Sequence, residues 1–146
     1  MTVENQVFVS HSGRDAFEAS LLQYVLETML ASQGVVAWTF ERDQSRSEKE
    51  IARSLKDRVR KSLAAIFLVS PDTLESGASQ WMELAYADAF AVTSFVLLHR
   101  LSFQELKNHE TGVPPLLLSS QCNSALEWRA VVDEIKTLLK RQKENG

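Results

Sequence analysis

Residues 63–69 form the longest unbroken apolar stretch of the sequence, and they constrain the fold more than any other feature. A strand with one face in water carries a polar residue at about every second position, and this stretch carries none. Strands that are apolar on both faces are typical of parallel sheets that helices cover on each side. The stretch is also far shorter than the roughly 20 residues that a membrane-spanning helix needs. It therefore predicts a central strand of an α/β fold.

Shorter apolar runs alternate with longer amphipathic segments along the rest of the chain. Strands are also predicted at residues 7–9, 35–38 and 94–98, with at most a short edge strand at 113–118, where two prolines lie. Helices are predicted at residues 15–32, from Ser47 onward, at about 80–90, at 101–107, and from Ser124 to about Lys140. This order predicts a parallel sheet with right-handed crossovers. We expect a single domain over residues 1–146, with its core at about 5–140 and a frayed tail at 141–146.

Several residues mark where these helices begin and end. Ser47 with Glu50, and Ser124 with Glu127, form S-x-x-E capping boxes that start a helix. Gly34 follows the first helix, where a C-terminal cap favours a positive φ angle. Apolar residues of the first helix recur on two adjacent lines, which are Phe17, Leu21, Val25 and Met29, and Leu22, Leu26 and Leu30.

Ligands of parallel α/β sheets bind beyond the carboxyl ends of the strands. Four polar segments follow predicted strands, at residues 10–15, 39–47, 70–80 and 99–102. The first of them, SHSGRD, has one glycine and fits neither the dinucleotide-binding nor the phosphate-loop glycine pattern. The third predicted strand ends in Ser70 and Pro71 rather than in the aspartate of a phospho-acceptor domain, and no G-x-S-x-G elbow is present.

Charge and cysteine content narrow the possible partners. The formal net charge is −3, so no basic field favours nucleic acid or an anionic membrane surface. Cys122 is the single cysteine, which excludes an internal disulfide and a Cys/His zinc pattern, and we expect a buried or half-buried structural thiol. The N-terminal residues show no signal-peptide pattern, so we expect a reducing, cytoplasmic setting.

Taken in order, the segments resemble the Toll/interleukin-1 receptor (TIR) domains, particularly the bacterial ones. VFVSHSGRD resembles the first strand and its polar turn, and VVAWTFERDQSRSEKEIARSL resembles the second strand, the BB loop and the next helix. SLAAIFLVSPDTLES resembles the third strand and its S-P turn, and SQWMELAYADAF resembles the helix with the family's tryptophan and glutamate. FVLLHR and VPPLLL are similar to the last two strands. The resemblance implies a flavodoxin-like three-layer α/β sandwich, with a five-stranded parallel sheet in the order 2-1-3-4-5 and helices on both faces.

The resemblance also implies an activity. Some TIR domains cleave NAD between nicotinamide and ribose, and some of those cyclise the product, whereas others are scaffolds that assemble through TIR–TIR contacts. Many bacterial members serve antiphage immune signalling and act when a sensor domain or partner protein clusters them. We therefore expect an NAD glycohydrolase or cyclase, with NAD as substrate, no cofactor and no metal. A non-enzymatic TIR adaptor, and a nucleotide-binding or nucleoside-transferring domain of similar topology, are the alternatives.

The catalytic carboxylate implied by the resemblance is Glu83, which keeps the family's E-x-x-x-A spacing to Ala87. Enzymatic members often show W-x-x-x-E, whereas Trp81 and Glu83 are W-x-E here, about 200° apart around a helix axis. A carboxylate early in a helix is also favoured by the helix dipole alone. Asp88, on the same predicted helix, is expected to face solvent.

The remaining candidates each have a structural alternative. Substrate contacts are expected from His11, Ser12, Arg14, Trp38 and Trp81, and loop or assembly contacts from Glu41, Arg42 and Asp43. The alternatives are core packing for the tryptophans, a hydrogen-bonded structural histidine, solvated charges in the loop and at Arg14, and a helix cap formed by Ser12 with Asp15. His99 and His109 lack a partner pattern and receive no role.

Overall fold

The computed structural model describes residues 5–39, 48–76, 78–109 and 112–145. Within these residues, one parallel sheet of five strands has the order β2-β1-β3-β4-β5. The strands are β1 (Asn5–Ser10), β2 (Val35–Thr39), β3 (Ala64–Val69), β4 (Thr93–Leu98) and β5 (Gln121–Ser124). The expected sheet order is therefore confirmed.

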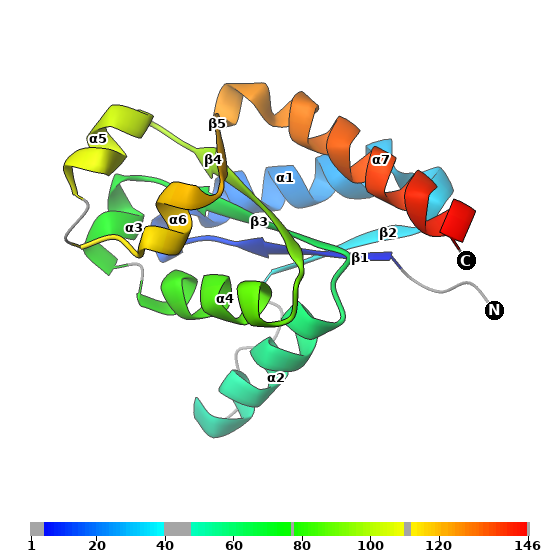
Figure 1. Ribbon diagram of the computed structural model, residues 1–146, viewed down its shortest axis with the longest axis horizontal. Coiled ribbons are helices and arrows are strands. Elements are labelled where there is room, and N and C mark those ends of the chain that lie inside the picture. The colour runs from blue at the N-terminus through cyan, green and yellow to red at the C-terminus, as the bar shows by residue number, and fades with distance from the viewer. Residues whose placement is uncertain (1–4, 40–47, 77, 110–111, 146) are drawn as a thin grey trace.

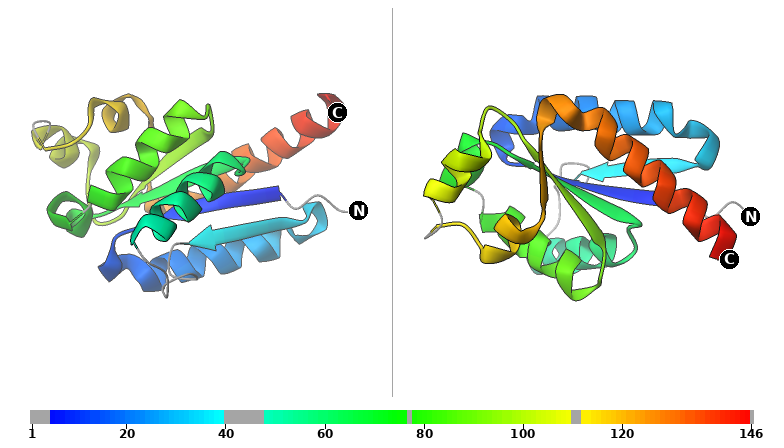
Figure 2. Two further views of the ribbon diagram at one scale, coloured as in Figure 1. Left: turned by 90° about the horizontal axis from the view of Figure 1, so that it is seen from below. Right: turned by 45° about the horizontal axis from the view of Figure 1, so that its top comes forward.

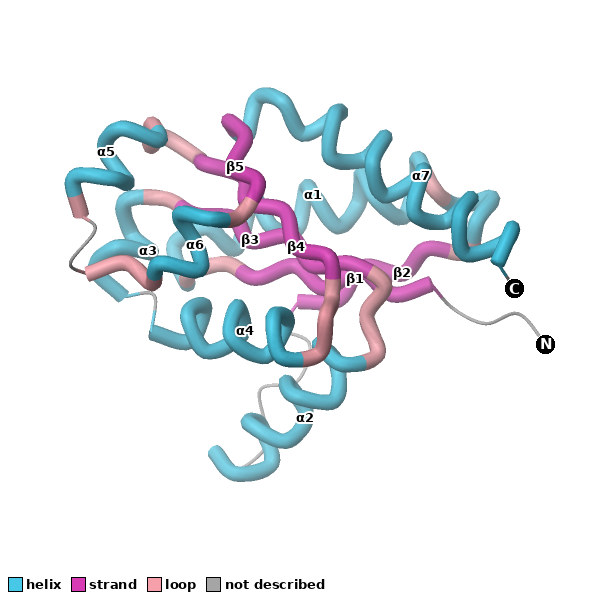
Figure 3. The backbone as a smooth tube through the Cα atoms, in the orientation of Figure 1, coloured by secondary structure: helices cyan, strands magenta, loops and turns pink. Residues whose placement is uncertain are grey.

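Helices cover both faces of the sheet and make three layers (Figure 1, Figure 3). One face is packed by α1 (Ala16–Met29) and α7 (Trp128–Asn145), and α7 runs obliquely over the sheet in the right-hand view of Figure 2. The other face is packed by α2 (Glu48–Arg60), α4 (Ala78–Ala89), α5 (Phe103–Asn108) and α6 (Pro115–Ser119). The α3 helix (Pro71–Ser76) and the 3-10 turns η1 (Gly13–Asp15), η2 (Ala31–Gln33) and η4 (Ala125–Glu127) complete the described elements.

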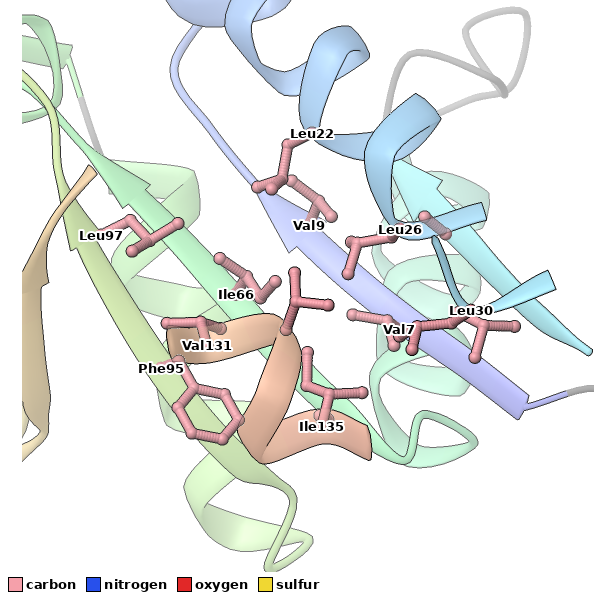
Figure 4. Packing of buried hydrophobic residues seen from close by; sticks show 14 of the residues in the cluster. Val7, Val9, Leu22, Leu26, Leu30, Ile66, Phe95, Leu97, Val131 and Ile135 are labelled. Atoms are coloured by element: carbon pink, nitrogen blue, oxygen red, sulfur yellow. The ribbon is translucent and has the colours of Figure 1, made fainter. Parts of the chain in front are cut away.

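The central strand explains the apolar stretch of the sequence. All six residues of β3 are buried, because β1 and β4 pair with its two edges and helices cover its two faces. Side chains alternate between two cores, so Ile66 packs with α1 and α7 while Phe67 packs with the helices opposite. Figure 4 shows the first core, where Leu26 of α1 and Ile135 of α7 meet the sheet residues between them.

The fifth strand lies elsewhere than the sequence predicted. Residues 113–118 were expected to hold it, but Pro115 occupies the first position of α6, where its fixed φ angle favours a helix. The strand is instead Gln121–Ser124, a short edge strand without a buried residue. An edge strand of this kind has no apolar alternation, so the sequence pattern gave no sign of it.

Two other boundaries differ from the prediction. The α3 helix begins directly at Pro71, where the sequence suggested only a break. The final helix extends to Asn145, so residues 141–145 are helical rather than a frayed tail. Of the two apolar lines in the first helical segment, Leu22 and Leu26 of α1 and the following Leu30 face the core, whereas Phe17 and Leu21 are exposed.

The turn at Gly34 agrees with the prediction, and the cap at Ser124 agrees in part. Gly34 has a φ angle of 68°, the left-handed conformation that a glycine reaches at low cost after a helix. Ser124 caps the final helical segment as predicted, but its Oγ accepts from the Leu126 N–H, whereas the predicted capping box with Glu127 would use the Glu127 N–H. Among the described residues, no helix is both long and apolar enough to cross a membrane.

Candidate functional site

Glu83 lies on the buried face of α4, although it is a charged residue type. Buried residues of this helix recur at Gln80, Glu83, Leu84 and Ala87, the spacing of a single helix face. The Glu83 side chain is 4% exposed, and its Oε1 accepts a hydrogen bond of 2.8 Å from Ser10 Oγ. Ser10 is the last residue of β1 and is itself buried. The carboxylate is therefore held at the carboxyl end of a central strand.

Burial changes the acidity of this carboxyl group. Removal from water raises the pKa of Glu83 from its ordinary value of 4.5 to about 7, and the hydrogen bond from Ser10 partly offsets that rise. Both protonation states are then populated near neutral pH. A carboxyl group with this property at the end of a parallel strand is typical of a site that performs chemistry.

A second buried carboxylate joins the first turn to the end of β3. Asp15 Oδ2 accepts hydrogen bonds from Ser12 Oγ, at 2.9 Å, and from Ser70 Oγ. Thr73 Oγ1 accepts from the Ser70 N–H at 3.1 Å, which fixes the start of α3. Ser12 makes no side-chain capping bond, so the expected Ser12–Asp15 helix cap is instead a side-chain pair. Asp15 therefore clamps two loops together.

Further charged side chains lie at this carboxyl-terminal edge of the sheet. His99 Nε2 lies 3.2 Å from Glu18 Oε2, and Arg100 Nη2 lies 4.0 Å from Asp15 Oδ1. Arg100 has a φ angle of 55°, which is uncommon for a residue with a side chain. Arg14 and Arg100 line a hollow of about 330 Å³ together with Pro71, Asp72 and Glu75. Three of the four polar segments that follow predicted strands, at residues 10–15, 70–80 and 99–102, therefore meet at the carboxyl-terminal edge of the sheet.

The expected substrate-binding turn divides into buried and exposed parts. His11 Nδ1 lies 2.7 Å from the Ser12 carbonyl oxygen, so that nitrogen donates a hydrogen bond to it. Ser12 is buried, and its hydroxyl group donates a hydrogen bond to Asp15. Arg14 is exposed, with its Nε 3.7 Å from Asp72 Oδ1. Of these residues, Arg14 is the one best placed to meet a ligand from solvent.

Both expected tryptophans pack against the core on the α4 side. Trp38 is buried and stacks on Phe8, with ring centroids 5.4 Å apart, and the Arg58 guanidinium lies 5.3 Å from its ring. Trp81 is partly buried against the same core, and it lies on α4 two positions before Glu83. These contacts favour the packing alternative for Trp38.

The remaining residues considered in the sequence are three loop residues, a cysteine and an aspartate. Glu41, Arg42 and Asp43 fall outside the described residues. Cys122 is half-buried, and burial raises the pKa of its thiol. Asp88 is exposed, as expected. No role was predicted for Ser10, Ser70, His99 or Arg100, and only their positions at or just beyond the carboxyl ends of strands could have drawn attention to them.

The α1 side of the molecule carries exposed apolar side chains. Phe17 and Tyr24 of α1 are 72% and 71% exposed, and Leu126 of η4 is 91% exposed. Leu21 lies on the same face of α1 and lines, with Leu126 and Trp128, a cavity of about 380 Å³. Apolar patches of this kind are typical of surfaces that contact other proteins.

Comparisons with known proteins agree with this architecture. A family model for the TIR domain matches residues 5–144. A comparison with curated proteins found no match.

Two solved structures are similar to the chain. One is the 2-desoxiribosyltransferase from Leishmania mexicana, at 16% identity and a TM-score of 0.52, with 64% of each chain covered. The other comprises the TIR domains of the activated Roq1 resistosome that directly recognises the pathogen effector XopQ, at 14% identity and a TM-score of 0.55. That match covers 94% of this chain and 82% of the other. At such identities both likenesses show the fold alone.

Proposed function

Because this chain belongs to the TIR domain family, we propose that it cleaves NAD at the bond between nicotinamide and ribose. The observation that carries the proposal is the buried Glu83 carboxyl group, whose pKa is raised to about 7 and which Ser10 holds at the carboxyl end of β1. NAD is the substrate in this proposal, and no cofactor takes part.

The chemistry needs little more than one well-placed carboxylate. The nicotinamide nitrogen is already cationic in NAD, so nicotinamide leaves as a neutral base without a general acid. The ribose that remains develops oxocarbenium character, and a nearby carboxylate in a water-poor site stabilises that positive charge. Glu83 supports this role because it is buried and Ser10 fixes one of its oxygens.

Neighbouring residues would bind the rest of the substrate. The turn of His11, Ser12 and Arg14 directly follows the strand that holds Glu83 in place, and the exposed Arg14 is suited to a phosphate. The proposal does not depend on Trp38, since its packing on Phe8 already explains that residue. Attack by water on the ribose would give ADP-ribose, and attack by a hydroxyl of the same molecule would give a cyclic product.

We further propose that the domain acts when it self-associates, in response to a sensor domain or a partner protein. The exposed apolar residues Phe17, Leu21 and Tyr24 support this, because a second copy that covers them would remove their apolar area from water. Antiphage immune signalling in the cytoplasm is the setting that we propose for this activity. Loss of NAD, or a nucleotide product, would then be the signal.

The direct test is nicotinamide release from NAD by the purified domain at high concentration with a crowding agent. We expect Glu83→Gln to lower release at least about 100-fold, because it removes the charge and keeps the shape. Asp88→Asn, on the exposed side of the same helix, is the matched control and should release nicotinamide at the wild-type rate. The mass of the ribose product distinguishes hydrolysis from cyclisation.

Other outcomes would change the proposal. Equal release by wild type and Glu83→Gln would remove Glu83 from the reaction. If fusion to an oligomeric scaffold still gives no release from wild type, the non-enzymatic adaptor is the better explanation. In that case signalling should survive Glu83→Gln and fail on disruption of the contacts between domains.

A further inference from the structure

Three ligand-type side chains converge where α1 begins and β4 ends. Asp15 closes the η1 turn, Glu18 follows three residues later in the first turn of α1, and His99 directly follows β4. The His99 N–H donates a hydrogen bond of 2.8 Å to the Val69 carbonyl, which fixes the backbone at that point. One carboxylate oxygen from each acid and one ring nitrogen of His99 all lie within 4.8 Å of one another.

A buried oxygen of Asp15 provides a second and independent observation. Asp15 is fully buried, and its Oδ2 accepts both serine hydroxyl groups. Its Oδ1 is buried but accepts no hydrogen bond within the described parts of the chain. Arg100 Nη2 lies 4.0 Å away, beyond hydrogen-bond distance, on a side chain that is 67% exposed. Since a buried carboxylate oxygen without a donor is costly, this atom is suited to a positive ligand.

We propose that Asp15, Glu18 and His99 bind a divalent transition-metal cation of the Mn²⁺ type. Two carboxylates and a neutral imidazole carry a charge of −2, which balances the cation. Oxygen ligands suit Mn²⁺, whereas the imidazole disfavours Mg²⁺ and Ca²⁺, and no thiolate is present to favour a softer ion. Ser12 and Ser70 orient the Asp15 carboxylate, as outer hydrogen-bond partners do at metal sites.

The geometry needs only small adjustments to close around an ion. Ligand atoms about 2.1 Å from a metal lie about 3 to 4 Å apart. Nε2 of His99 and Oε2 of Glu18 already satisfy this at 3.2 Å, and both side chains are partly exposed and free to rotate slightly. The ion would replace Arg100 as the charge nearest to Asp15 and would join the first turn to the end of β4. This role is separate from the proposed cleavage of NAD.

The test uses chelator-treated wild-type protein and Mn²⁺ alone. We expect one saturable Mn²⁺ site by electron paramagnetic resonance, with the broadening of amide NMR signals strongest at residues 15–18 and 99–100. His99→Ala and Glu18→Gln should each weaken binding at least about tenfold. His109→Ala, which removes an exposed histidine elsewhere, should bind as wild type does.

Three results would overturn the proposal. These are no saturable binding to wild type, unchanged binding in both His99→Ala and Glu18→Gln, or broadening centred on other residues. Far-ultraviolet circular dichroism of each variant identifies any that has lost its fold. Because the two ligands changed are both partly exposed and lie on different elements, the site is tested by two independent variants.

Discussion

Ser10 donates a hydrogen bond of 2.8 Å to Glu83, although 73 residues separate the two in the sequence. The bond joins the end of β1 to the middle of α4, and both residues are buried. A donor at this distance favours the charged form of the carboxyl group, while the apolar surroundings favour the neutral form. The balance between these two effects sets the acidity of the proposed catalytic group.

The first prediction concerns the pH dependence of NAD cleavage. If the carboxylate form of Glu83 is the active form, kcat/KM should rise with pH and level off above about 7, the raised pKa of that group. Well below that value, it should fall about tenfold for each pH unit. Initial rates of nicotinamide release from pH 5 to 9 measure this. A profile that is flat from pH 5 to 7 would contradict it.

Loss of the Ser10 hydroxyl should shift that profile. Ser10→Ala removes the hydrogen bond that favours the charged carboxylate, so the pKa of Glu83 should rise further and the acid limb should move to higher pH. The maximal rate at high pH should change less than the rate at pH 7. Ser119→Ala, at an exposed hydroxyl that bonds only within α6, is the control and should leave the profile unchanged.

Protein stability should depend on the same group. Because the pKa of Glu83 is higher in the folded state than in the unfolded chain, the folded state binds an extra proton between about pH 4.5 and 7. Its stabilising effect is fully present below pH 4.5 and is lost as pH rises through 7. Glu83→Gln should therefore be more stable than wild type at pH 8, by at most about 3 kcal/mol, and similar to it near pH 4.5. Denaturant unfolding at both pH values measures the difference.

The hydrogen bonds to the Asp15 carboxylate predict that the loss of one of them destabilises the folded protein. Ser70→Ala removes a buried donor to the Asp15 carboxylate and should lower the free energy of unfolding by about 1–3 kcal/mol. Chemical denaturation compares it with Ser119→Ala, which should stay within about 0.5 kcal/mol of wild type. Equal stability of the two variants would mean that the clamp contributes little to folding.

The exposed apolar face of α1 predicts how self-association responds to mutation. Leu21→Glu places a charge beside the exposed Phe17 and Tyr24, so it should prevent association without lowering the melting temperature. Phe103→Glu adds the same charge at an exposed apolar residue of α5, on the opposite face of the sheet, and serves as the control. Sedimentation velocity across a range of concentrations reports the outcome. Association that is equally weakened in both variants would reflect net charge rather than this surface.

The sequence predicted the elements whose residues carry a strong local pattern. Residues 63–69 could hardly be anything but a central strand, because apolar side chains on both faces need cover on both sides. Gly34 marked the end of a helical segment for a similar local reason. By contrast, α1 is apolar around much of its circumference, so periodicity alone could not decide that Leu22 faces the core and Leu21 faces solvent.

The candidate site was predictable only in part. Glu83 was identified through the resemblance to the TIR family, in which it keeps the spacing to Ala87, and its catalytic role stays a prediction; the structure shows that it is buried and lies beside the end of β1. Ser10 and His99 were not given roles, because their partners lie on other elements of the chain. Contacts of that kind depend on strand order and helix placement, which no local pattern encodes.

The edge strand β5 bears on how copies of this chain can join. At one edge, β5 is only four residues long, and its polar side chains stay partly in water. Such a strand offers few backbone groups to an incoming strand, so continuous extension of the sheet from molecule to molecule is disfavoured there. Association through helices, in contrast, would leave the hydrogen bonds of the sheet intact. In the proposed self-association, clustering through helices would switch the activity on without extending the sheet, which would also guard against fibrous aggregation.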